Sequence, residues 1–242
     1  MTESITQQGP EATQETLGNV LITGGASGLG AAVAEAVRAA GGTPLVIDQV
    51  APHPDIVHFI QADIGDSEAA ESAVDALAER AGGIDAVFTA AGVDSCGPLH
   101  KVPRKEWERV IHVNLLGTVS VVRAALPYLE RNAGRVVTCA STLGLRAVSD
   151  ATAYCASKFA VVGFTRALAA ETAGRVGVTL LVPGGMETAF FDGRDEQYKP
   201  PPDAMLNKPA DVAKAVLFAL RQPPGCEVRE LLVCSSTEGS WP

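Results

Sequence analysis

The stretch Asn19-Val-Leu-Ile-Thr-Gly-Gly-Ala-Ser-Gly-Leu-Gly30 decides the fold of this chain. It begins with a short apolar run that ends in glycine, a pattern typical of a buried strand that meets a turn. Apolar residues at helical spacing follow, at Leu29, Val33, Val37 and Ala40. A strand, a glycine-rich turn and a helix in this order present free backbone N–H groups and a helix N-terminus to a phosphate.

The glycines of this turn have separate expected tasks. Gly24 and Gly28 let the backbone turn and approach a ligand, and Gly30 lets the helix pack closely on the strand. Their spacing is Gly-x-x-x-Gly-x-Gly, which differs from the Gly-x-Gly-x-x-Gly dinucleotide fingerprint. Such a turn is structural about as often as functional, so a phosphate site depends on support from the rest of the chain.

The acid Asp48 closes the next apolar run, residues 44–48, and stands 18 residues beyond Gly30. A carboxylate at that place accepts both hydroxyls of a ribose and repels a 2′-phosphate. No arginine or lysine lies in the glycine turn or directly after Asp48. The pattern predicts NAD in preference to NADP, and the alternative is a solvated aspartate at a strand end.

Strand-like and helix-like segments alternate along the rest of the chain. Further strands are expected at residues 57–60, 84–90, 134–140, 175–182 and 227–234, and helices at 67–81, 103–131, 152–172 and 211–220. Residues 49–56 contain two prolines and are too few for a crossover helix, so a loop is expected there. The alternation predicts an α/β fold, a single doubly wound Rossmann-like domain over residues 18–242, with seven parallel strands and helices on both faces. Residues 1–17 are expected to form a disordered tail, and the irregular residues 187–208 a lid.

Tyr154 and Lys158 stand four residues apart in a run without a helix breaker, so they share one face of a helix. A phenol with a pKa near 10 is a poor acid or base at neutral pH. An ammonium about 4 Å away at an effective dielectric near 20 favours the phenolate by roughly 4 kcal/mol, which lowers its pKa by about three. The pair therefore predicts proton transfer, and the alternative is a tyrosine that packs on a lysine stem.

Three further polar residues are candidates for the same site. Ser141 closes the fifth strand 13 residues before Tyr154, where a serine ordinarily serves a turn. Asn114 stands among apolar residues of a helix, which costs free energy unless the amide is hydrogen bonded, and a neighbouring backbone group would satisfy it. Asp63 follows the third strand and would either accept from an adenine amino group or cap the next helix, a task that Asp66 can also perform.

The overall composition argues against several classes of function. A net charge of −9 and a pI near 4.9 disfavour a nucleic-acid partner, which needs a basic surface. No apolar run approaches the roughly 18–20 residues of a bilayer span, and residues 1–17 lack the features of a secretory signal. The five cysteines form no C-x-x-C pair and the four histidines no cluster, so no metal site is expected. Free thiols in a reducing cytoplasm are the expected state.

Taken together, these residues resemble the short-chain dehydrogenase/reductase family in its compact single-domain form. The resemblance extends over residues 19–233 and rests on a set of motifs in a fixed order. The motifs are Thr23-Gly-x-x-x-Gly28-x-Gly30, Asp48, Asp63, Asn114, Ser141, Tyr154-x-x-x-Lys158, and Pro183-Gly184 with Thr188. The set is far more specific than any one of its members.

The resemblance implies a role for each of these residues. Tyr154 is the general acid or base, and Ser141 hydrogen-bonds the reacting oxygen. Lys158 lowers the pKa of the tyrosine and binds the nicotinamide ribose, and Asn114 positions a water that links Lys158 to solvent. The implied NAD-binding residues are Gly24, Ser27, Gly28, Leu29, Gly30, Asp48, Gln49, Asp63, Ile64, Ala90, Ala91, Gly92, Tyr154, Lys158, Pro183, Gly184, Met186 and Thr188. Within that set, Asp48 would hold the adenosine ribose, Asp63 and Ile64 the adenine, and Thr188 the carboxamide.

The chain departs from the family pattern in two places. The family commonly has Asn-Asn-Ala-Gly after the fourth strand, where this chain has Thr89-Ala-Ala-Gly92. Ala90 keeps the backbone path but removes a side-chain hydrogen bond, which bears on local rigidity more than on catalysis. The short connection of residues 49–56 leaves the adenine side more open.

The resemblance implies a cytoplasmic NAD-dependent alcohol dehydrogenase or ketone reductase. It also implies a homotetramer that uses residues 103–131, 152–172, the last strand and Trp241. The expected substrate is a medium-sized, partly hydrophobic secondary alcohol or ketone in a mostly apolar pocket walled by residues 93–97, 143–146 and 186–198. Asp94, Arg146 and Glu187 are the candidate polar contacts there. Alternatives are a hydroxy- or 3-oxoacyl thioester, a steroid-like polycycle or a small diol as substrate, a non-redox reaction such as epimerisation, and cofactor sensing without turnover.

Overall fold

The computed structural model describes residues 17–241, so the expected tail lies outside the described residues except for its last position. The strands are β1 (Asn19–Thr23), β2 (Thr43–Asp48), β3 (His58–Gln61), β4 (Ala86–Thr89), β5 (Arg135–Cys139), β6 (Gly177–Pro183) and β7 (Glu230–Val233). The α-helices are α1 (Gly28–Ala39), α2 (Ser67–Ala81), α3 (Arg104–Ile111), α4 (Thr118–Asn132), α5 (Thr152–Glu171) and α6 (Pro209–Leu220). Every strand and helix predicted from the sequence is present, and the ends differ by a few residues.

The strands lie parallel in one seven-stranded sheet, in the order β3-β2-β1-β4-β5-β6-β7. The predicted α/β class with a seven-stranded parallel sheet is therefore confirmed. The order reverses between β1 and β4, and in doubly wound sheets a crevice opens beyond the carboxyl ends of the strands at such a point. The glycine turn after β1 and the segment after β4 thus border the same crevice.

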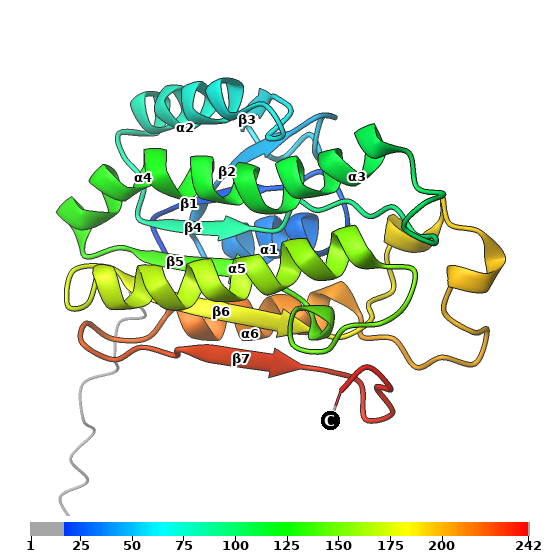
Figure 1. The fold of residues 1–242 in the computed structure, drawn as a ribbon. Coiled ribbons are helices and arrows are strands. Elements are labelled where there is room, and N and C mark those ends of the chain that lie inside the picture. Colours follow the sequence, from blue (N-terminus) through cyan, green and yellow to red (C-terminus); the bar gives the residue numbers. More distant parts are fainter. Residues whose placement is uncertain (1–16, 242) are drawn as a thin grey trace, which may run out of the picture.

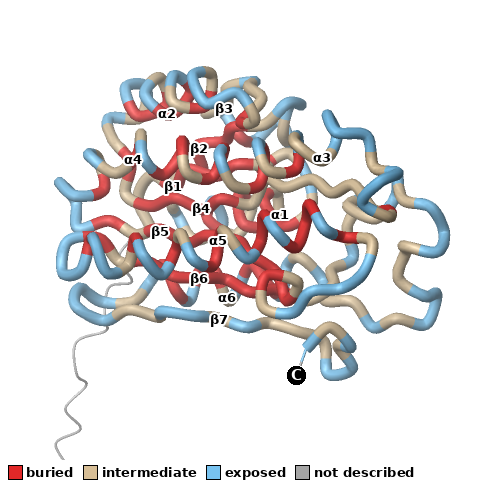
Figure 2. Tube along the Cα trace, viewed as in Figure 1, coloured by how far each residue is buried: buried red, intermediate tan, exposed pale blue. Residues whose placement is uncertain are grey.

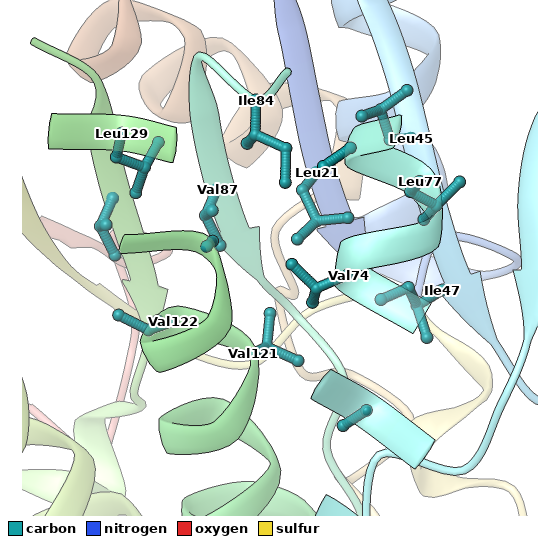
Figure 3. Close-up of a cluster of buried hydrophobic side chains, with 14 of the residues drawn as sticks. Leu21, Leu45, Ile47, Val74, Leu77, Ile84, Val87, Val121, Val122 and Leu129 are labelled. Atoms are coloured by element: carbon teal, nitrogen blue, oxygen red, sulfur yellow. The ribbon is translucent and has the colours of Figure 1, made fainter. Parts of the chain in front are cut away.

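Helices cover both faces of the sheet (Figure 1). On one face α2, α4 and α5 pack over a cluster of buried side chains that includes Leu21, Val74 and Val121 (Figure 3). On the other face α1 and α6 pack against each other over a second cluster, with Val33 and Val216 at its centre. The inner strands β1, β2, β4, β5 and β6 are buried from both sides, as Figure 2 shows in red, and for this reason they form continuous apolar runs in the sequence. The edge strands β3 and β7 are partly exposed.

The glycine turn joins β1 to α1 as expected. Gly28 has a φ of +52°, which a residue with a side chain rarely adopts, and a Cβ at Gly30 would overlap the carbonyl oxygen of Gly24. Ser27 precedes the helix, but its side chain caps none of the first N–H groups, and the first turn of α1 holds no acid. Those N–H groups therefore remain available to an anion.

The helix expected at residues 103–131 is divided into α3 and α4 by a π-helical turn, His112–Gly117. Gly117 lies at the end of this turn. Its lack of a side chain lets the backbone at Ile64 pack closely against the helix, because a Cβ at Gly117 would lie 2.6 Å from the carbonyl oxygen of Ile64. The connection from β2 to β3 is a loop, as its prolines predict. Of the two candidate capping residues, Asp66 and not Asp63 caps α2, because the Asp66 side chain accepts hydrogen bonds from Glu68 N and Ala69 N.

The combined helix Arg104–Asn132 is the one helix of the described residues with the length and composition of a membrane span. By that measure, the expectation that no apolar run approaches bilayer length is wrong. Half of its most apolar window is buried inside the protein. Val121, Val122 and Leu129 of α4 belong to the core on one face of the sheet, which accounts for the apolar composition.

Residues 187–208 extend from the carboxyl end of β6 and are drawn in amber in Figure 1. They hold two short 3₁₀ turns, Ala189–Phe191 and Glu196–Tyr198. The two ends of the segment meet at a bridge, where Glu187 N donates to Asn207 O and Asn207 N donates to Gly185 O, both at 2.9 Å. The segment therefore has an ordered base at the strand ends, and its action as a lid stays a prediction.

Candidate active site

One cavity of about 1020 Å³ lies at the carboxyl ends of the strands, across the point where the strand order reverses. It brings together nearly all residues that the sequence singled out. These are Gly24, Ser27, Gly28, Leu29, Gly30, Asp48, Gln49, Ile64, Ala90, Ala91, Gly92, Ser141, Tyr154, Lys158, Pro183, Gly184, Met186 and Thr188. The predicted site residues that do not line it are Asn114 and Asp63.

The turn after β1 forms a cradle of bare backbone at one end of the cavity. A Cβ at Gly24 would lie 2.8 Å from Ala91 Cα, and a Cβ at Gly28 would lie 3.4 Å from the Thr188 side chain. Only glycine leaves this space open. Together with the uncapped N-terminus of α1, the cradle fits the pyrophosphate of a dinucleotide, with Thr188 opposite.

Asp48, at the end of β2, is held toward the glycine turn by two backbone groups. Its Oδ2 accepts from Ala26 N at 2.9 Å and its Oδ1 accepts from Val50 N at 3.2 Å. Each oxygen of an ionised carboxylate can accept a further hydrogen bond. The side chain therefore presents a fixed negative charge with free acceptor positions to the cavity, which suits a ribose diol and disfavours a 2′-phosphate.

Tyr154 lies in the first turn of α5 with its ring buried and facing the cavity. Burial raises the pKa of Tyr154 above its ordinary value, and the nearby Cys139 acts in the same direction. Hydrogen bonding by Ser141 opposes this rise in the pKa. The predicted lowering of the tyrosine pKa by Lys158 is therefore wrong in this structure, because desolvation of the phenolate outweighs the attractive contacts.

Lys158 follows one turn later on α5 and is almost completely buried. Its Nζ donates to the carbonyl oxygen of Cys139 at 2.8 Å and lies 5.6 Å from the centroid of the Tyr154 ring. Burial lowers the pKa of Lys158, since the ammonium has lost its water. The ammonium is thus placed beneath the tyrosine, and its bound partner is a backbone carbonyl.

Ser141 begins the connection after β5, at the rim of the cavity next to Tyr154. Its Oγ accepts from Leu143 N at 3.1 Å and so starts a 3₁₀ turn, Thr142–Gly144. The turn chemistry expected of a serine after a strand is therefore present. Ser141 and Tyr154 both line this cavity, so the residue that starts the turn also belongs to the site.

Asn114 lies in the π-helical turn, buried behind the cavity wall. Its Oδ1 accepts from Val93 N at 2.8 Å, and its Nδ2 donates to Val93 O at 2.9 Å and to Ser157 Oγ at 3.0 Å. The side chain therefore braces the segment after β4 against α5, the simpler of the two expected roles. A Cβ at Gly92 would lie 3.5 Å from Asn114 Oδ1 and 3.6 Å from Lys158 Nζ, so both flank that glycine. The water relay stays a prediction.

Asp63 does not face the cavity as the adenine assignment requires. Its Oδ2 accepts from Arg109 Nη1 at 3.0 Å, and its Oδ1 accepts from Gly65 N at 2.9 Å. Partial burial would raise the pKa of Asp63, but the bonds from Gly65 and Arg109 outweigh it and lower the pKa. Arg109 lines the cavity in place of the acid, and no sequence pattern connects these two residues, which are 46 positions apart.

Arg194, which the sequence did not single out, joins residues 187–208 to the segment after β4. Its Nη2 donates to Asp94 Oδ2 at 2.7 Å, in an ion pair whose side chains are 17% and 6% exposed. The guanidinium lies over the rings of Phe190 and Phe191, at 4.8 and 4.7 Å from their centroids. Phe190 in turn packs on Tyr154, with 5.6 Å between ring centroids.

The polar contacts predicted for the substrate pocket are wrong, because Asp94, Arg146 and Glu187 are not among the residues that line the cavity. Asp94 pairs with Arg194, and Arg146 Nη1 donates to Gly239 O at 3.2 Å. Other polar groups line the cavity, including Thr142, Asp203 and Glu238. Tertiary folding brings these groups to the site from three separate segments.

The departure at Ala90 leaves the backbone path intact. Ala90 N donates to Thr23 O at 3.2 Å, and Ala91 N donates to Thr23 Oγ1 at 3.3 Å. Beside them Thr89 Oγ1 is buried without a hydrogen-bond partner among residues 17–241. Within that same range, no group of three His, Cys, Asp or Glu side chains could hold a metal ion.

Comparisons with known proteins agree with this geometry. The family profile described as short chain dehydrogenase matches residues 18–199. An uncharacterized oxidoreductase of Staphylococcus aureus is 32% identical over 224 residues, which cover 88% of this chain and 95% of that protein. A 3-ketoacyl-(acyl-carrier-protein) reductase from Brucella melitensis, complexed with NADH, superposes with a TM-score of 0.81 at 26% identity, covering 91% and 98% of the two chains. A short chain dehydrogenase from Burkholderia cenocepacia in complex with NADP gives 0.79 at 26% identity, with the same coverage.

Proposed function

The chain belongs to the short-chain dehydrogenase/reductase family, as an oxidoreductase, and we propose that it uses NAD to interconvert a secondary alcohol and a ketone. The observation that carries this proposal is the convergence of Tyr154, Ser141 and Lys158 on the cavity that also contains the glycine cradle and Asp48. A bound nicotinamide would supply the hydride chemistry. The protein positions the cofactor and the substrate, places charged groups beside them and exchanges a proton with the substrate.

Tyr154 acts as the general acid or base of this reaction. Its hydroxyl takes the proton from an alcohol that is being oxidised and returns it to the oxygen of a ketone that is being reduced. Ser141 holds the same substrate oxygen by a hydrogen bond. Lys158 lies one helical turn from Tyr154, with its Nζ 5.6 Å from the centroid of the tyrosine ring, and would bind the nicotinamide ribose.

The proposed preference for NAD over NADP rests on Asp48. The two solved relatives described above hold NADH in one case and NADP in the other, so membership of the family leaves the choice of cofactor open. The carboxylate of Asp48 is fixed by Ala26 N and Val50 N, and no cationic side chain of residues 17–241 forms an ion pair with it. A 2′-phosphate placed there would meet a like charge.

The second candidate function is reduction of a 3-oxoacyl thioester, which the name of the Brucella melitensis relative favours. A cavity of about 1020 Å³ is large enough for either class of substrate. Cofactor sensing and non-redox chemistry receive less support, since Ser141, Tyr154 and Lys158 converge on one cavity. We further propose that the protein is a cytoplasmic homotetramer and that it binds neither nucleic acid nor a membrane.

The test is the Tyr154→Phe variant of the full chain, assayed with NAD and a panel of secondary alcohols by the absorbance of NADH. We expect kcat/KM to fall by about 10²- to 10⁴-fold, because phenylalanine has no proton to exchange. Tyr128→Phe is the matched control, since that hydroxyl lies on α4 and donates to Asp75 outside the cavity. Equal activity of Tyr154→Phe and wild type would remove Tyr154 from the mechanism, and no turnover of any alcohol or ketone would favour cofactor sensing.

The pH profile of the wild type gives the same test a second readout. Burial raises the pKa of Tyr154, so the phenolate fraction increases with pH across the neutral and alkaline range. Oxidation, which needs the phenolate, should therefore accelerate as the pH rises, while reduction, which needs the protonated phenol, should change little. Oxidation that slows with rising pH would contradict the role of Tyr154 as the base.

A further inference from the structure

The residues that follow β7 form one wall of the cavity. Thr237, Glu238, Gly239 and Ser240 all line it. In Figure 1 this segment is the red chain that turns back beneath the strand ends, at the same end of the molecule as residues 187–208. We call residues 235–240 the post-β7 segment.

Glu238 fixes the post-β7 segment to the turn that follows β6. Its Oε2 accepts from Gly185 N at 2.8 Å, and its Oε1 accepts from Ser240 N at 3.1 Å and from Ser240 Oγ at 2.7 Å. A Cβ at Gly184 would overlap Glu238 Oε2, so the carboxylate lies directly against the Pro183-Gly184 turn. The absence of a side chain at Gly184 leaves the room that Glu238 occupies.

The same segment is attached on the other side of the cavity, next to Ser141. The hydroxyl groups of Ser240 and Thr142 are 2.6 Å apart, and Arg146 Nη1 donates to Gly239 O at 3.2 Å. The segment therefore spans from the turn after β6 to the turn after β5. Both turns carry residues placed above at the reacting end of the cavity.

Glu238 is a negative charge without a cationic partner among the described residues. The cations that line the cavity are otherwise engaged: Arg109 with Asp63, Arg194 with Asp94, and Lys158 with a buried carbonyl. Partial burial would raise the pKa of Glu238, but hydrogen bonds from Ser240 and Gly185 outweigh it and lower the pKa. The carboxylate is therefore ionised at neutral pH.

The carboxylate of Glu238 can accept a further hydrogen bond. An ionised carboxylate has about four acceptor positions, and the contacts with Gly185 and Ser240 use three of them. The position that remains is on Oε2, on a residue that borders the cavity. A ligand group that donates a hydrogen bond satisfies it, whereas a carboxylate or phosphate meets like charge.

We infer that Glu238 is a specificity-determining residue, which selects substrates that carry a hydroxyl or ammonium group beside the reacting alcohol and rejects substrates that carry a carboxylate or phosphate. This inference rests on the proposed function and narrows its substrate class.

The experiment compares three secondary alcohols that share one carbon skeleton and differ at one end: 4-amino-2-butanol, 1,3-butanediol and 3-hydroxybutyrate. For the full-length wild type, kcat/KM should be highest for the first two and lowest for the anion. In Glu238→Gln, the ratio of 1,3-butanediol to 3-hydroxybutyrate should fall by about tenfold, as expected for one partly screened charge. Any of the three that is not turned over is ranked by its Ki against an alcohol that is.

Two variants control this experiment. Glu238→Asp keeps the charge and should keep the wild-type ranking, which separates an effect of charge from damage to the fold. Glu230→Gln makes the same change of net charge on β7, where the side chain pairs with Arg166 outside the cavity, and should leave the ranking unchanged.

The inference fails if the ratio of kcat/KM for 1,3-butanediol to that for 3-hydroxybutyrate is the same in wild type and Glu238→Gln. It also fails if Glu238→Gln weakens only the binding of NAD, measured by fluorescence, because Glu238 would then support the cofactor turn alone. Either result leaves the proposed function standing. Loss of the proposed function is recognised separately, by a Tyr154→Phe variant as active as the wild type.

Discussion

At the scale of single residues, backbone N–H groups orient the two carboxylates for which ligand contacts are proposed. Asp48 is oriented by Ala26 N and Val50 N, and Glu238 by Gly185 N and Ser240 N. A side chain held in this way keeps one rotamer and loses little further entropy when a ligand binds. Each carboxylate is thus prepared for a ligand hydroxyl in advance.

Asp48→Ser should shift cofactor preference toward NADP. The change removes the like charge that a 2′-phosphate would meet, so the ratio of kcat/KM with NAD to that with NADP should fall by about tenfold or more. Steady-state rates with each cofactor measure the ratio. Asp55→Ser is the control, because Asp55 lies on the same β2–β3 connection but does not line the cavity. A wild type that prefers NADP would contradict the assignment.

Residue spacing predicted which side chains meet, but not their ionisation. Tyr154 and Lys158 share a helix face as predicted, yet burial controls the pKa of both, and burial is a property of the folded chain. Asp63 and Asp66 were equivalent in the sequence. Only the structure distinguishes them, with Asp63 bound to Arg109 and Asp66 capping α2.

At the scale of elements, residues 187–208 are held over the cavity by one buried ion pair. Arg194 bonds to Asp94 on the segment after β4, and Phe190 packs on Tyr154. The exposed ion pair within the same segment, Lys199 with Glu196, has no partner outside it. Tyr198 OH also donates to Asp150 Oδ2 at 3.2 Å, so the ion pair of Arg194 is the buried charged contact among several that attach the segment.

Asp94→Asn should loosen residues 187–208. Removing one partner of a buried ion pair costs about 3–5 kcal/mol, because the other charge stays buried and uncompensated. Hydrogen exchange measured by mass spectrometry should show faster exchange in this segment, and the KM for the alcohol should rise while NAD binding holds. Glu196→Gln, which breaks the exposed pair, should do neither. Unchanged exchange in Asp94→Asn would mean that the other contacts, among them Phe190 on Tyr154 and Tyr198 with Asp150, are sufficient to hold the segment.

Periodicity was sufficient to locate the helices and strands, and it failed where tertiary contacts alter a local preference. The π-helical turn at His112–Gly117 is one such place, since the sequence alone predicts one helix over residues 103–131. The attachment of Glu238 to Gly185 is another, because 53 residues separate them and no spacing rule connects the two.

At the scale of the whole molecule, exposed apolar side chains lie on the elements through which a homotetramer is proposed to form. Leu116 lies in the π-helical turn, Phe159 on α5, Leu232 on β7 and Trp241 beyond it, all of them exposed. Apolar side chains gathered on particular elements are characteristic of protein–protein contact. The proposed tetramer would bury them.

The mass in solution tests this assembly. Light scattering should give about 100 kDa for the wild type, four times the chain mass of 25.0 kDa. Phe159→Glu should yield smaller species, because a charge would then have to be buried between subunits. Val57→Glu is the control, since Val57 is also exposed but precedes the edge strand β3. A wild type that elutes as a monomer would overturn the proposal.

The π-helical turn also sets a limit on how the gene can change. An α-helix rotates about 100° with each residue, so excising one codon between His112 and Gly117 could restore regular α-helical geometry while rotating Asn114 off Val93 and Ser157. The backbone would gain regularity, and the wall beside Lys158 would lose its brace. The π-helical turn, and not a regular α-helix, is therefore the geometry that keeps Asn114 in contact with Val93 and Ser157.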